Sequence, residues 1–402
     1  MIDNLPNGWR IEELNKCGKI VTGKTPSKRI EEYWNSNDIS FIKPDDFNKH
    51  TIIEFDKGKD FISHEGFKKA TKVPPYSVLV TCIGNIGNIL INKNEATTNQ
   101  QINSIIPNKD IDYKYLAYAI KKIKPIMIDR ANAPVVPIIN KTDFGKFTIP
   151  IPPLQQQEKI VKVLDLSSNL IEKQKELLKK YDLFLKSKFI EMFGNPSKNV
   201  MNWNIEKFEK YIEYIGDIGS NGSNAVISKN LKMLDTVDYA LMIRTTNLNK
   251  NDFINDVKYV SEETYNFFKK SKIFGGEIIM NKIGSAGKFW KMPYLNKPVS
   301  LGLNQLVIRL KNLNTEYLYY LLSTEYGQLV ISSKTNGAVT QSITKGAVKD
   351  IDIMIPPIEL QNKFASIVEK IEIIKEKENQ KLKQLEDLHN SLMQKAFKGE
   401  IE

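Results

Sequence analysis

The chain has very little cysteine and histidine for its length. Its 402 residues include 2 cysteines and 3 histidines. Cys17 and Cys82 cannot build a disulfide framework, so we expect an intracellular, cytoplasmic protein. Such a small supply of thiol and imidazole groups also excludes a zinc cluster and disfavours catalysis by histidine. We therefore expect no metal site on this chain.

Long apolar runs are missing as well. The longest, such as Tyr76–Val80, are far shorter than the roughly 20 residues that cross a membrane. Hydrophobic residues still make up 41% of the chain and charged residues 26%, which is enough for packed cores and is not typical of disorder. The formal net charge of +11 and the isoelectric point near 9.2 favour a polyanionic partner over a membrane.

An internal repeat organises the sequence. Residues 132–153, NAPVVPIINKTDFGKFTIPIPP, align without a gap with residues 336–357, NGAVTQSITKGAVKDIDIMIPP. Four further pairs follow the same order: VPPYSVLVTCIGNIG from Val73 with IFGGEIIMNKIGSAG from Ile273, Asn99-Gln100 with Asn304-Gln305, YKYLAYAI from Tyr113 with TEYLYYLL from Thr315, and IKPDDFN from Ile42 with IRTTNLN from Ile243. A unit of about 200 residues is too long for a solenoid repeat, so the chain contains two copies of one module.

Each copy divides into a mixed part and a helical part. The mixed parts contain short runs of strand-forming residues between glycine, asparagine and proline, together with a short helix, and predict an α/β or α+β domain. The runs are Val78–Ile83, Ile102–Ile106, Ile278–Ile283 and Leu306–Leu310. Residues 154–193 contain no glycine or proline and carry apolar residues at heptad spacing, which predicts one long helix ended by Gly194. A second is expected over residues 358–397, and paired apolar stripes favour an antiparallel coiled coil.

One motif suggests a different function. Residues 18–25, GKIVTGKT, fit the P-loop pattern of nucleotide hydrolases. A P-loop follows an apolar strand and opens a helix, whereas residues 11–16 read as a short helix and Pro26 follows the motif. Ile20, Val21 and Thr22 are β-branched and favour a strand. A P-loop nucleotide hydrolase is kept as an alternative function.

Several short motifs occur in a characteristic order along nearly the whole chain. They are LPNGW at Leu5–Trp9, GKTPS at Gly23–Ser27 followed by Tyr33-Trp34, IPIPP at Ile149–Pro153, FGNP at Phe193–Pro196, IPP at Ile355–Pro357 and FKGEI at Phe397–Ile401. With the duplicated plan, this order resembles the specificity subunits of type I restriction–modification enzymes. The second copy departs from the pattern, because GSNGS at Gly219–Ser223 replaces the glycine-threonine-proline element.

The resemblance implies two target recognition domains, at residues 1–152 and 196–355, and two long helices, at 153–195 and 356–402. Each domain would read one half of a bipartite, asymmetric site in double-stranded DNA, while the helices would separate the domains and dock two modification subunits. The chain itself would not be catalytic. The modification subunits would methylate adenine with S-adenosylmethionine, and restriction subunits would use ATP and Mg²⁺. A coiled-coil scaffold that binds DNA without sequence specificity is a second alternative.

Recognition of DNA requires phosphate contacts and base contacts. The candidates for phosphate contacts are Lys68, Lys69, Lys72, Lys121, Lys122, Lys124, Lys269, Lys270 and Lys272. The candidates for base contacts are donors and acceptors in loops, namely Lys24, Thr25, Ser27, Lys28, Arg29, Asn85, Asn99, Gln100, Gln101, Arg244, Thr245, Thr246, Ser285, Asn304 and Gln305. For each lysine cluster a merely solvated surface is the alternative, and for the glycine-rich turns around Asn85 and Ser285 a structural role is as plausible as DNA contact.

Overall fold

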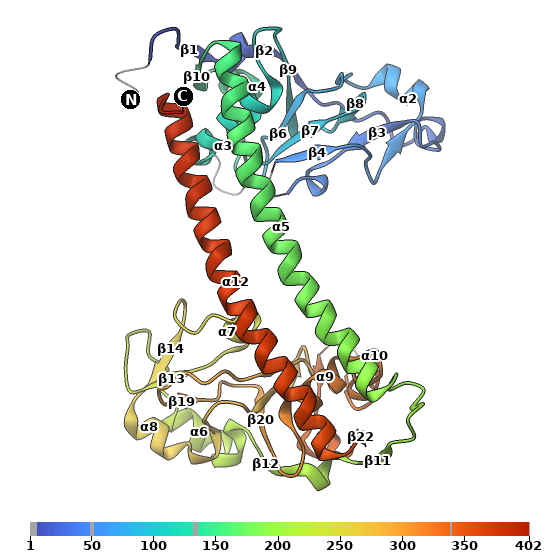
Figure 1. The fold of residues 1–402 in the computed structure, drawn as a ribbon, viewed down its shortest axis with the longest axis vertical. Helices are drawn as coiled ribbons and strands as arrows, with labels where there is room; N and C mark the ends of the chain where they lie inside the picture. Colours follow the sequence, from blue (N-terminus) through green and yellow to red (C-terminus); the bar gives the residue numbers. More distant parts are fainter. Residues whose placement is uncertain (1–5, 49–51, 132–135, 338–339, 402) are drawn as a thin grey trace. The chain divides into compact units, whose positions relative to one another are not determined.

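The computed structural model describes residues 6–48, 52–131, 136–337 and 340–401 (Figure 1). Leu5, His50 and parts of the two long aligned segments, residues 132–135 and 338–339, lie outside these ranges. The chain forms two compact units, a first unit of residues 1–175 with 380–402 and a second unit of residues 176–379. Each unit combines one mixed domain with parts of both long helices.

The first domain is built on two sheets. A five-stranded sheet has the order β2-β9-β6-β7-β4 and a three-stranded sheet the order β5-β3-β8, while β1 pairs with β10. The elements are β1 (Arg10–Glu13), α1 (Leu14–Cys17), β2 (Gly18–Thr22), η1 (Glu31–Tyr33), β3 (Ile39–Ile42), η2 (Pro44–Asp46), β4 (Ile53–Phe55), β5 (Phe61–Ile62), α2 (His64–Lys69), β6 (Val78–Thr81), β7 (Ile89–Asn92), β8 (Ala96–Thr98), β9 (Ile102–Pro107), α3 (Tyr113–Arg130), α4 (Lys141–Gly145) and β10 (Thr148–Ile151).

Strand alternation explains how the two sheets and the helices share one core. Side chains of β6 point alternately to opposite faces of the sheet. Val78 and Val80 pack into the cluster that contains Tyr115 of α3, whereas Leu79 packs with Ile42 of the three-stranded sheet. All four residues of β6 are buried, because both faces are covered.

The second domain repeats this plan. Its sheets have the orders β12-β20-β16-β18 and β14-β13-β19-β15, and β11 pairs with β22. The elements are β11 (Asn204–Lys207), η3 (Phe208–Tyr211), β12 (Ile212–Gly216), η4 (Ile218–Asn221), α6 (Asn224–Asn230), β13 (Ala240–Met242), α7 (Thr245–Lys250), β14 (Lys258–Val260), α8 (Glu262–Phe267), η5 (Lys269–Ser271), β15 (Lys272–Ile273), β16 (Ile278–Asn281), β17 (Ile283–Gly284), β18 (Phe289–Lys291), β19 (Val299–Ser300), β20 (Gln305–Leu310), α9 (Thr315–Ser323), α10 (Glu325–Ser333), β21 (Gln341–Ser342), α11 (Lys345–Lys349) and β22 (Asp352–Ile355).

The strand pairings confirm the duplication and correct one part of its alignment. β3 pairs antiparallel with β5 and parallel with β8, and β13 pairs in the same two ways with β14 and β19. In the main sheets Thr81 faces Ile102, and its counterpart Asn281 faces Gln305. Gln305 is therefore equivalent to Ile102, and the predicted match of Gln305 with Gln100 is wrong by two residues. Sequence similarity misaligned this turn because the two copies reach the strand through different loops.

The helix that follows β9 differs between the copies. In the first domain α3 runs unbroken through Pro125 for 18 residues, longer than the predicted short helix. In the second domain the same region forms α9 and α10, which meet at Thr324. Thr324 caps α10 by accepting a hydrogen bond from Gly327 N, and this local capping interrupts the helix.

The long helices begin and end close to their predicted limits. Helix α5 spans Leu154–Phe193 and stops at Gly194, whose φ of +77° is unfavourable for a side chain. Helix α12 spans Ile358–Lys398. None of the helices in the described ranges is long and apolar enough to cross a membrane.

Within each unit the segments of α5 and α12 lie side by side in opposite directions. In the second unit the Phe189 and Phe364 ring centroids are 5.4 Å apart and Lys375 Nζ is 2.8 Å from Asp182. In the first unit Lys175 contacts Glu386, and Gln156, nearer the start of α5, donates to the carbonyl of Ile401, just beyond the end of α12. Of the apolar residues that follow the heptad spacing of α5, Leu164, Ile171 and Leu185 are buried, whereas Leu170 and Phe184 are exposed. The heptad packing of a coiled coil stays a prediction.

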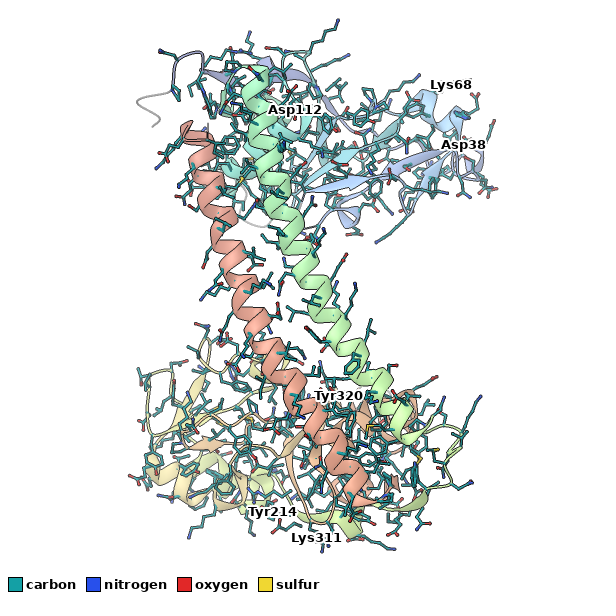
Figure 2. All side chains as sticks on the ribbon, viewed as in Figure 1. Asp38, Lys68, Asp112, Tyr214, Lys311 and Tyr320 are labelled. Atoms are coloured by element: carbon teal, nitrogen blue, oxygen red, sulfur yellow. The ribbon has the colours of Figure 1, made fainter. Side chains whose placement is uncertain are left out.

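A buried glutamine attaches each long helix to its own domain. Gln157 Oε1 accepts a hydrogen bond from Asp112 N, the residue that caps α3, at 2.8 Å, and Gln157 Nε2 donates to Pro152 O at 2.9 Å. Figure 2 shows Asp112 beside α5. Gln361 of α12 accepts in the same way from Asn314 N, the cap of α9, at 2.9 Å. Both glutamine side chains are buried, so their amides have no access to water and depend on these hydrogen bonds between helix and domain.

A histidine lies where α5 and α12 meet in the first unit. His389 is 6% exposed, its Nδ1 lies 2.8 Å from Ser167 Oγ, and its Nε2 has no partner among the described residues. Burial, followed by the nearby charge of Lys121, lowers the pKa of His389 to about 4. The repeat places Leu185, which is fully buried in the second unit, at the position equivalent to His389. The polar contact is therefore specific to the first unit.

We expect acidification to weaken the first unit through His389. Because the folded-state pKa of about 4 is below the unfolded value, the contribution of neutral His389 is complete above about pH 6.5 and is lost as the pH falls towards 4. The loss should reach roughly 2–3 kcal/mol. Thermal unfolding of the intact chain at pH 7, 5.5 and 4 measures it, with His389→Leu as the matched variant. An equally steep fall in stability for His389→Leu would contradict the assignment.

Candidate nucleic-acid interface

Four chain segments meet at one edge of the first domain. β6 and β9 are antiparallel neighbours, so the end of β6 and the start of β9 share that edge, and β2 ends there with Thr22 opposite Asn103. β3 and β8 are parallel and end together at Ile42 and Thr98. We name the segments 22–29, 42–46, 81–88 and 98–102 the first loop edge. The polar residues that the sequence separates by up to 80 positions therefore come together in space.

Hydrogen bonds between these loops confirm that they are neighbours. Thr25 Oγ1 lies 2.7 Å from Gln100 Oε1, and Asn99 N donates to Ile42 O at 3.3 Å. Thr71 Oγ1 donates to Thr22 O at 2.9 Å, which brings the end of α2 with its lysines to the same edge. Lys68 projects from α2 in Figure 2. The exposed candidates here are Lys24, Ser27, Lys28, Arg29, Lys69, Lys72, Asn85 and Gln100, while Thr25, Asn99 and Gln101 are half-buried.

In the turns around Asn85 and Ser285, glycine has a structural role. Gly84 and Gly87 adopt φ values of +76° and +74°, and Gly284 and Gly287 adopt +89° and +82°. A side chain is strained in this left-handed region, so the turn geometry requires glycine in both copies. Each turn holds one exposed polar residue, such as Asn85, at its tip.

The lysines of α3 are placed differently from the rest. Lys124 Nζ donates to Asn88 Oδ1 at 2.7 Å and supports the turn after β6. Lys121 lines a cavity of about 580 Å³ between α3, α5 and α12 of the first unit, and burial lowers its pKa. Lys122 lines the same cavity. Lys124 therefore contacts the first loop edge, whereas Lys121 and Lys122 line the cavity along the long helices.

The second domain has an equivalent edge, formed by segments 216–223, 243–247, 281–288 and 300–305, which we name the second loop edge. Thr245 Oγ1 lies 2.9 Å from Asn281 Oδ1, and Asn281 Nδ2 donates to Ser285 Oγ at 2.7 Å. Gln305 Nε2 donates to Thr245 Oγ1 at 3.3 Å, but Gln305 is fully buried, so we leave it out of the proposed contact surface. Asn281, which the sequence did not single out, is also buried and supports this edge from inside.

The remaining candidates of the second domain surround this cluster. Thr246, Lys269, Lys270, Ser285 and Asn304 are exposed, and Arg244, Thr245 and Lys272 are half-buried. Asn304 O accepts a hydrogen bond from Lys282 N at 2.6 Å, which fixes the turn before β20. Lys272 Nζ donates to Asn266 Oδ1 at 2.9 Å and lies 4.1 Å from the Tyr265 ring centroid.

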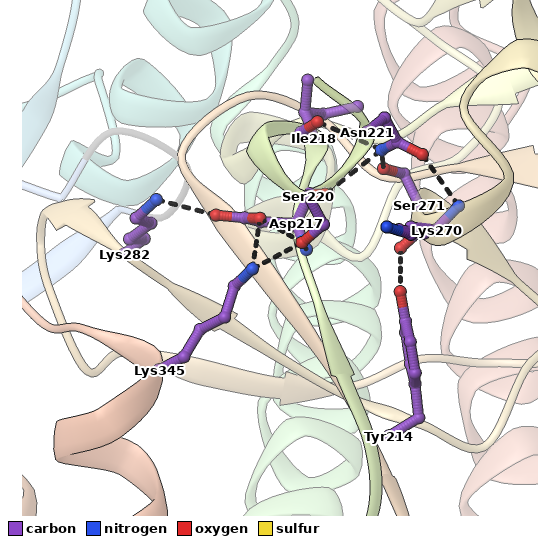
Figure 3. A network of polar contacts seen from close by, with 9 residues as sticks. All are labelled: Tyr214, Asp217, Ile218, Ser220, Asn221, Lys270, Ser271, Lys282 and Lys345. Carbon is purple, nitrogen blue, oxygen red and sulfur yellow. Dashed lines mark hydrogen bonds and ion pairs between the residues drawn. The ribbon is translucent and has the colours of Figure 1, made fainter. Parts of the chain in front are cut away.

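A buried carboxylate holds the second loop edge together (Figure 3). Asp217 is 5% exposed and lies 2.7 Å from the Nζ atoms of both Lys282 and Lys345, and Ser220 Oγ donates to it at 2.6 Å. Burial alone would raise the pKa of Asp217, but the hydrogen bonds from Lys282, Lys345 and Ser220 hold it well below its usual range. Asp217 is therefore a permanent anion in a cluster that joins η4, the end of β16 and the start of α11.

The same network reaches the predicted phosphate-binding lysines. Lys270 N donates to Asn221 Oδ1 at 2.9 Å, Asn221 Nδ2 donates to Ser271 Oγ at 2.8 Å, and Tyr214 OH donates to Lys270 O at 2.7 Å (Figure 3). The backbone of Lys270 is thus held from two sides while its side chain is exposed. The GSNGS segment that departs from the first copy supplies this support.

Among its described residues, the first domain has no counterpart of this ion network. Strand pairing places Thr22 at the position of Asp217 and Cys82 at the position of Lys282. Thr22 Oγ1 instead donates to Asn103 Oδ1 at 2.7 Å. The two loop edges share a frame but differ in the groups that support them.

The P-loop pattern does not form a phosphate-binding loop. Gly18–Thr22 is strand β2, paired along its length with β9, and the residues after Gly23 do not open a helix. Residues 10–13 form strand β1, so the predicted helix over residues 11–16 is wrong except for the short α1 that begins at Leu14. The comparisons below also give the nucleotide hydrolase no support. In the part of the chain described, no group of three or more His, Cys, Asp or Glu could hold a metal ion.

The family model for the type I restriction modification DNA specificity domain matches residues 6–180 and 204–387. The chain therefore belongs to this family, with one match in each copy of the repeat.

Curated relatives carry the same family name. The chain is 32% identical over 206 residues to the type I restriction enzyme MjaIX specificity subunit of Methanocaldococcus jannaschii, covering 49% of this chain and 47% of the relative. It is 30% identical over 189 residues to the HindI specificity subunit of Haemophilus influenzae, covering 45% and 41%. These two alignments span less than half of each relative. The MjaVIII specificity subunit of M. jannaschii aligns over 99% of this chain and 94% of its own length, at 23% identity.

Solved structures share the fold. The S subunit of a type I restriction–modification system from M. genitalium matches with a TM-score of 0.54 at 14% identity, covering 98% of both chains. A chain from a structure of type I restriction–modification complex assembly and conformational transition matches with a TM-score of 0.58 at 14% identity, again covering 98% of both chains. The duplicated architecture is thus that of known S subunits.

We expect Asp217→Asn to destabilise the second unit by roughly 2–3 kcal/mol. The variant leaves Lys282 and Lys345 without their anion, but both lysines are about one-third exposed and water limits the penalty. Asp350→Asn is the matched control, because Asp350 also contacts two lysines but is exposed, and its loss should change stability little. Denaturant unfolding followed by a probe in the second domain compares them. Equal effects of the two variants would refute the role assigned to Asp217.

Proposed function

We propose that the chain is the DNA-recognition subunit of a type I restriction–modification complex and reads a bipartite, asymmetric site in double-stranded DNA. The observation that carries the proposal is the duplicated loop edge: each domain presents the same four segments at the same edge, with exposed basic and amide side chains. The basic net charge and the specificity-subunit names of the relatives support it.

The proposed division of labour follows from exposure and chemistry. Four exposed lysines would bind phosphates, which fixes the register on the duplex: Lys69 at the end of α2, Lys72 just after it, and Lys269 and Lys270 in η5. Donors and acceptors at the loop tips would read base edges. The base-reading candidates we keep are Lys24, Thr25, Ser27, Lys28, Arg29, Asn85, Asn99, Gln100, Arg244, Thr245, Thr246, Ser285 and Asn304.

The proposed partners are two modification subunits and the restriction subunits. Exposed apolar residues on α5, with Leu166 at 62% and Leu183 at 63%, support docking of another protein on this helix. Chemistry would reside on those partners, with S-adenosylmethionine for methylation and ATP and Mg²⁺ for restriction, and this chain would act in the cytoplasm without catalysis. Within that scheme residues 1–152 and 196–355 are the recognition domains, and residues 153–195 and 356–402 are the helices.

Methylome sequencing tests the function. A host that expresses the chain with its modification subunits should show methylated adenines in a motif of two short half-sites and a fixed gap.

Exchanging residues 1–152 for those of another family member should change one half-site only, because separate domains contribute base contacts roughly additively. The absence of any methylated motif would contradict the proposed function. A change in both half-sites after the exchange would contradict the independent reading of one half-site by each domain.

The two kinds of contact should behave differently on mutation. Lys269→Ala with Lys270→Ala should weaken binding to every sequence and lower the salt slope by about 1 to 2, roughly one for each lost phosphate contact. Arg244→Ala should relax preference at one base position by about 1–3 kcal/mol. Titration of the assembled complex against randomised sites separates them. A scaffold without sequence specificity would bind cognate and random DNA with the same affinity and slope.

A further inference from the structure

The same kind of cation occupies the same place in both domains. Lys43 follows β3, and Arg244 follows the equivalent strand β13. The backbone N–H of Lys43 donates to Asp46 Oδ2 at 2.9 Å, and that of Arg244 donates to Asn247 Oδ1 at 3.1 Å. The local geometry that presents the cation is therefore repeated, although Lys43 was not among the residues predicted to bind DNA.

An aspartate from the next loop holds each cation. Lys43 Nζ lies 2.5 Å from Asp60 Oδ2, and Arg244 Nη2 lies 3.0 Å from Asp256 Oδ1. Asp60 directly precedes β5, and Asp256 lies two positions before β14, so the carboxylates come from the same loop but from different register positions of the strands that pair antiparallel with β3 and β13. The intervening loops differ in length and in sequence, so the cation–carboxylate pair recurs where little else in these loops does.

Stability does not explain this recurrence. The Lys43 and Asp60 side chains are 39% and 42% exposed, and Arg244 and Asp256 are 30% and 68% exposed. Exposed ion pairs contribute little to folding, so each cation can exchange its carboxylate for another anion at small cost. Arg244 Nη2 also donates to the backbone carbonyl oxygen of Asp256 and would exchange that acceptor as well. Arg244 Nε, moreover, is buried and finds no acceptor among the described residues. A guanidinium that turned towards a new acceptor would relieve that unpaired donor.

Both pairs lie at the loop edges. Asn99, beside Gln100, donates its N–H to Ile42 O, so Lys43 adjoins the amide-rich turn before β9. Arg244 adjoins Thr245, which contacts Asn281. Each cation is thus next to side chains already placed in the proposed contact surface.

We propose that Lys43 and Arg244 are equivalent DNA-contacting residues, one in each domain, and that Asp60 and Asp256 are built-in competitors that DNA must displace. This inference rests on the proposed function. A carboxylate beside the contact point repels every phosphate backbone, so it weakens binding to random DNA. At a cognate site the base contacts offset this repulsion, whereas at a random site nothing does. The aspartates therefore raise the ratio of specific to non-specific affinity.

Charge-neutral variants of the aspartates test this inference. Asp60→Asn and Asp256→Asn should each raise the affinity of the assembled complex for random duplex DNA about fivefold, and raise the affinity for cognate DNA less. Lys43→Gln should weaken cognate binding, and Asp60→Asn should have a much smaller effect in the Lys43→Gln background. Fluorescence anisotropy with both duplexes over a range of salt concentrations gives these affinities.

Asp56→Asn is the matched control. Asp56 forms an exposed pair with Lys93, 3.3 Å apart, but it follows β4, which runs parallel to β7 and ends at the opposite edge of the sheet. The same change of charge there should leave random-DNA affinity unaltered. If Asp60→Asn and Asp256→Asn do no more than Asp56→Asn while the wild-type complex prefers its cognate site, the competitor role is wrong and the proposed function stands. If the wild-type complex shows no preference for any sequence, the proposed function and the competitor role are both wrong.

Discussion

The joint between each domain and its long helix depends on one buried amide. Gln157 joins the carbonyl of Pro152 to the N–H that begins α3, and Gln361 joins Pro356 to the start of α9 in the same way. A buried amide left unpaired costs about 1–3 kcal/mol, so the helix can leave the sheet in only one direction without losing these bonds. The direction of the helix relative to its own domain follows from that requirement.

A second joint of the same kind strengthens the first. Tyr115 OH donates to Pro150 O at 2.6 Å, and Tyr317 OH donates to Met354 O at 2.9 Å. Both tyrosine side chains are fully buried, and burial raises the pKa of each hydroxyl, which stays a neutral donor. The frame of each domain is therefore held by short-range polar contacts inside an apolar core, and those contacts are the ones that the two copies share.

Unlike the frame, the two loop edges are not held by shared contacts. They lie where strands end, and their backbone is supported by different groups in the two copies: an ion cluster around Asp217 in the second domain, and Thr22 with Asn103 in the first. A sheet tolerates such changes because its core faces are untouched by the loops. Under the proposed function, the shared frame would hold two recognition edges that differ because each reads a different half-site. The repeated pairs of Lys43 with Asp60 and Arg244 with Asp256 are an exception to this divergence.

The sequence alone determined the features that depend on neighbours along the chain. The limits of α5 and α12 follow from apolar spacing, from the absence of glycine and proline, and from Gly194, all of which act within a few residues. The repeat and the order of short motifs were sufficient to recognise the family. Only the tertiary structure decided what depends on strands pairing at a distance. Register showed that Gln305 matches Ile102 and lies in the core, and topology brought Lys43, Asn281 and Asp217 to the loop edges. The side chains that contact these residues lie 17 positions away for Lys43 with Asp60 and up to 128 positions away for Asp217 with Lys345. Such neighbours exist only once the sheets have formed.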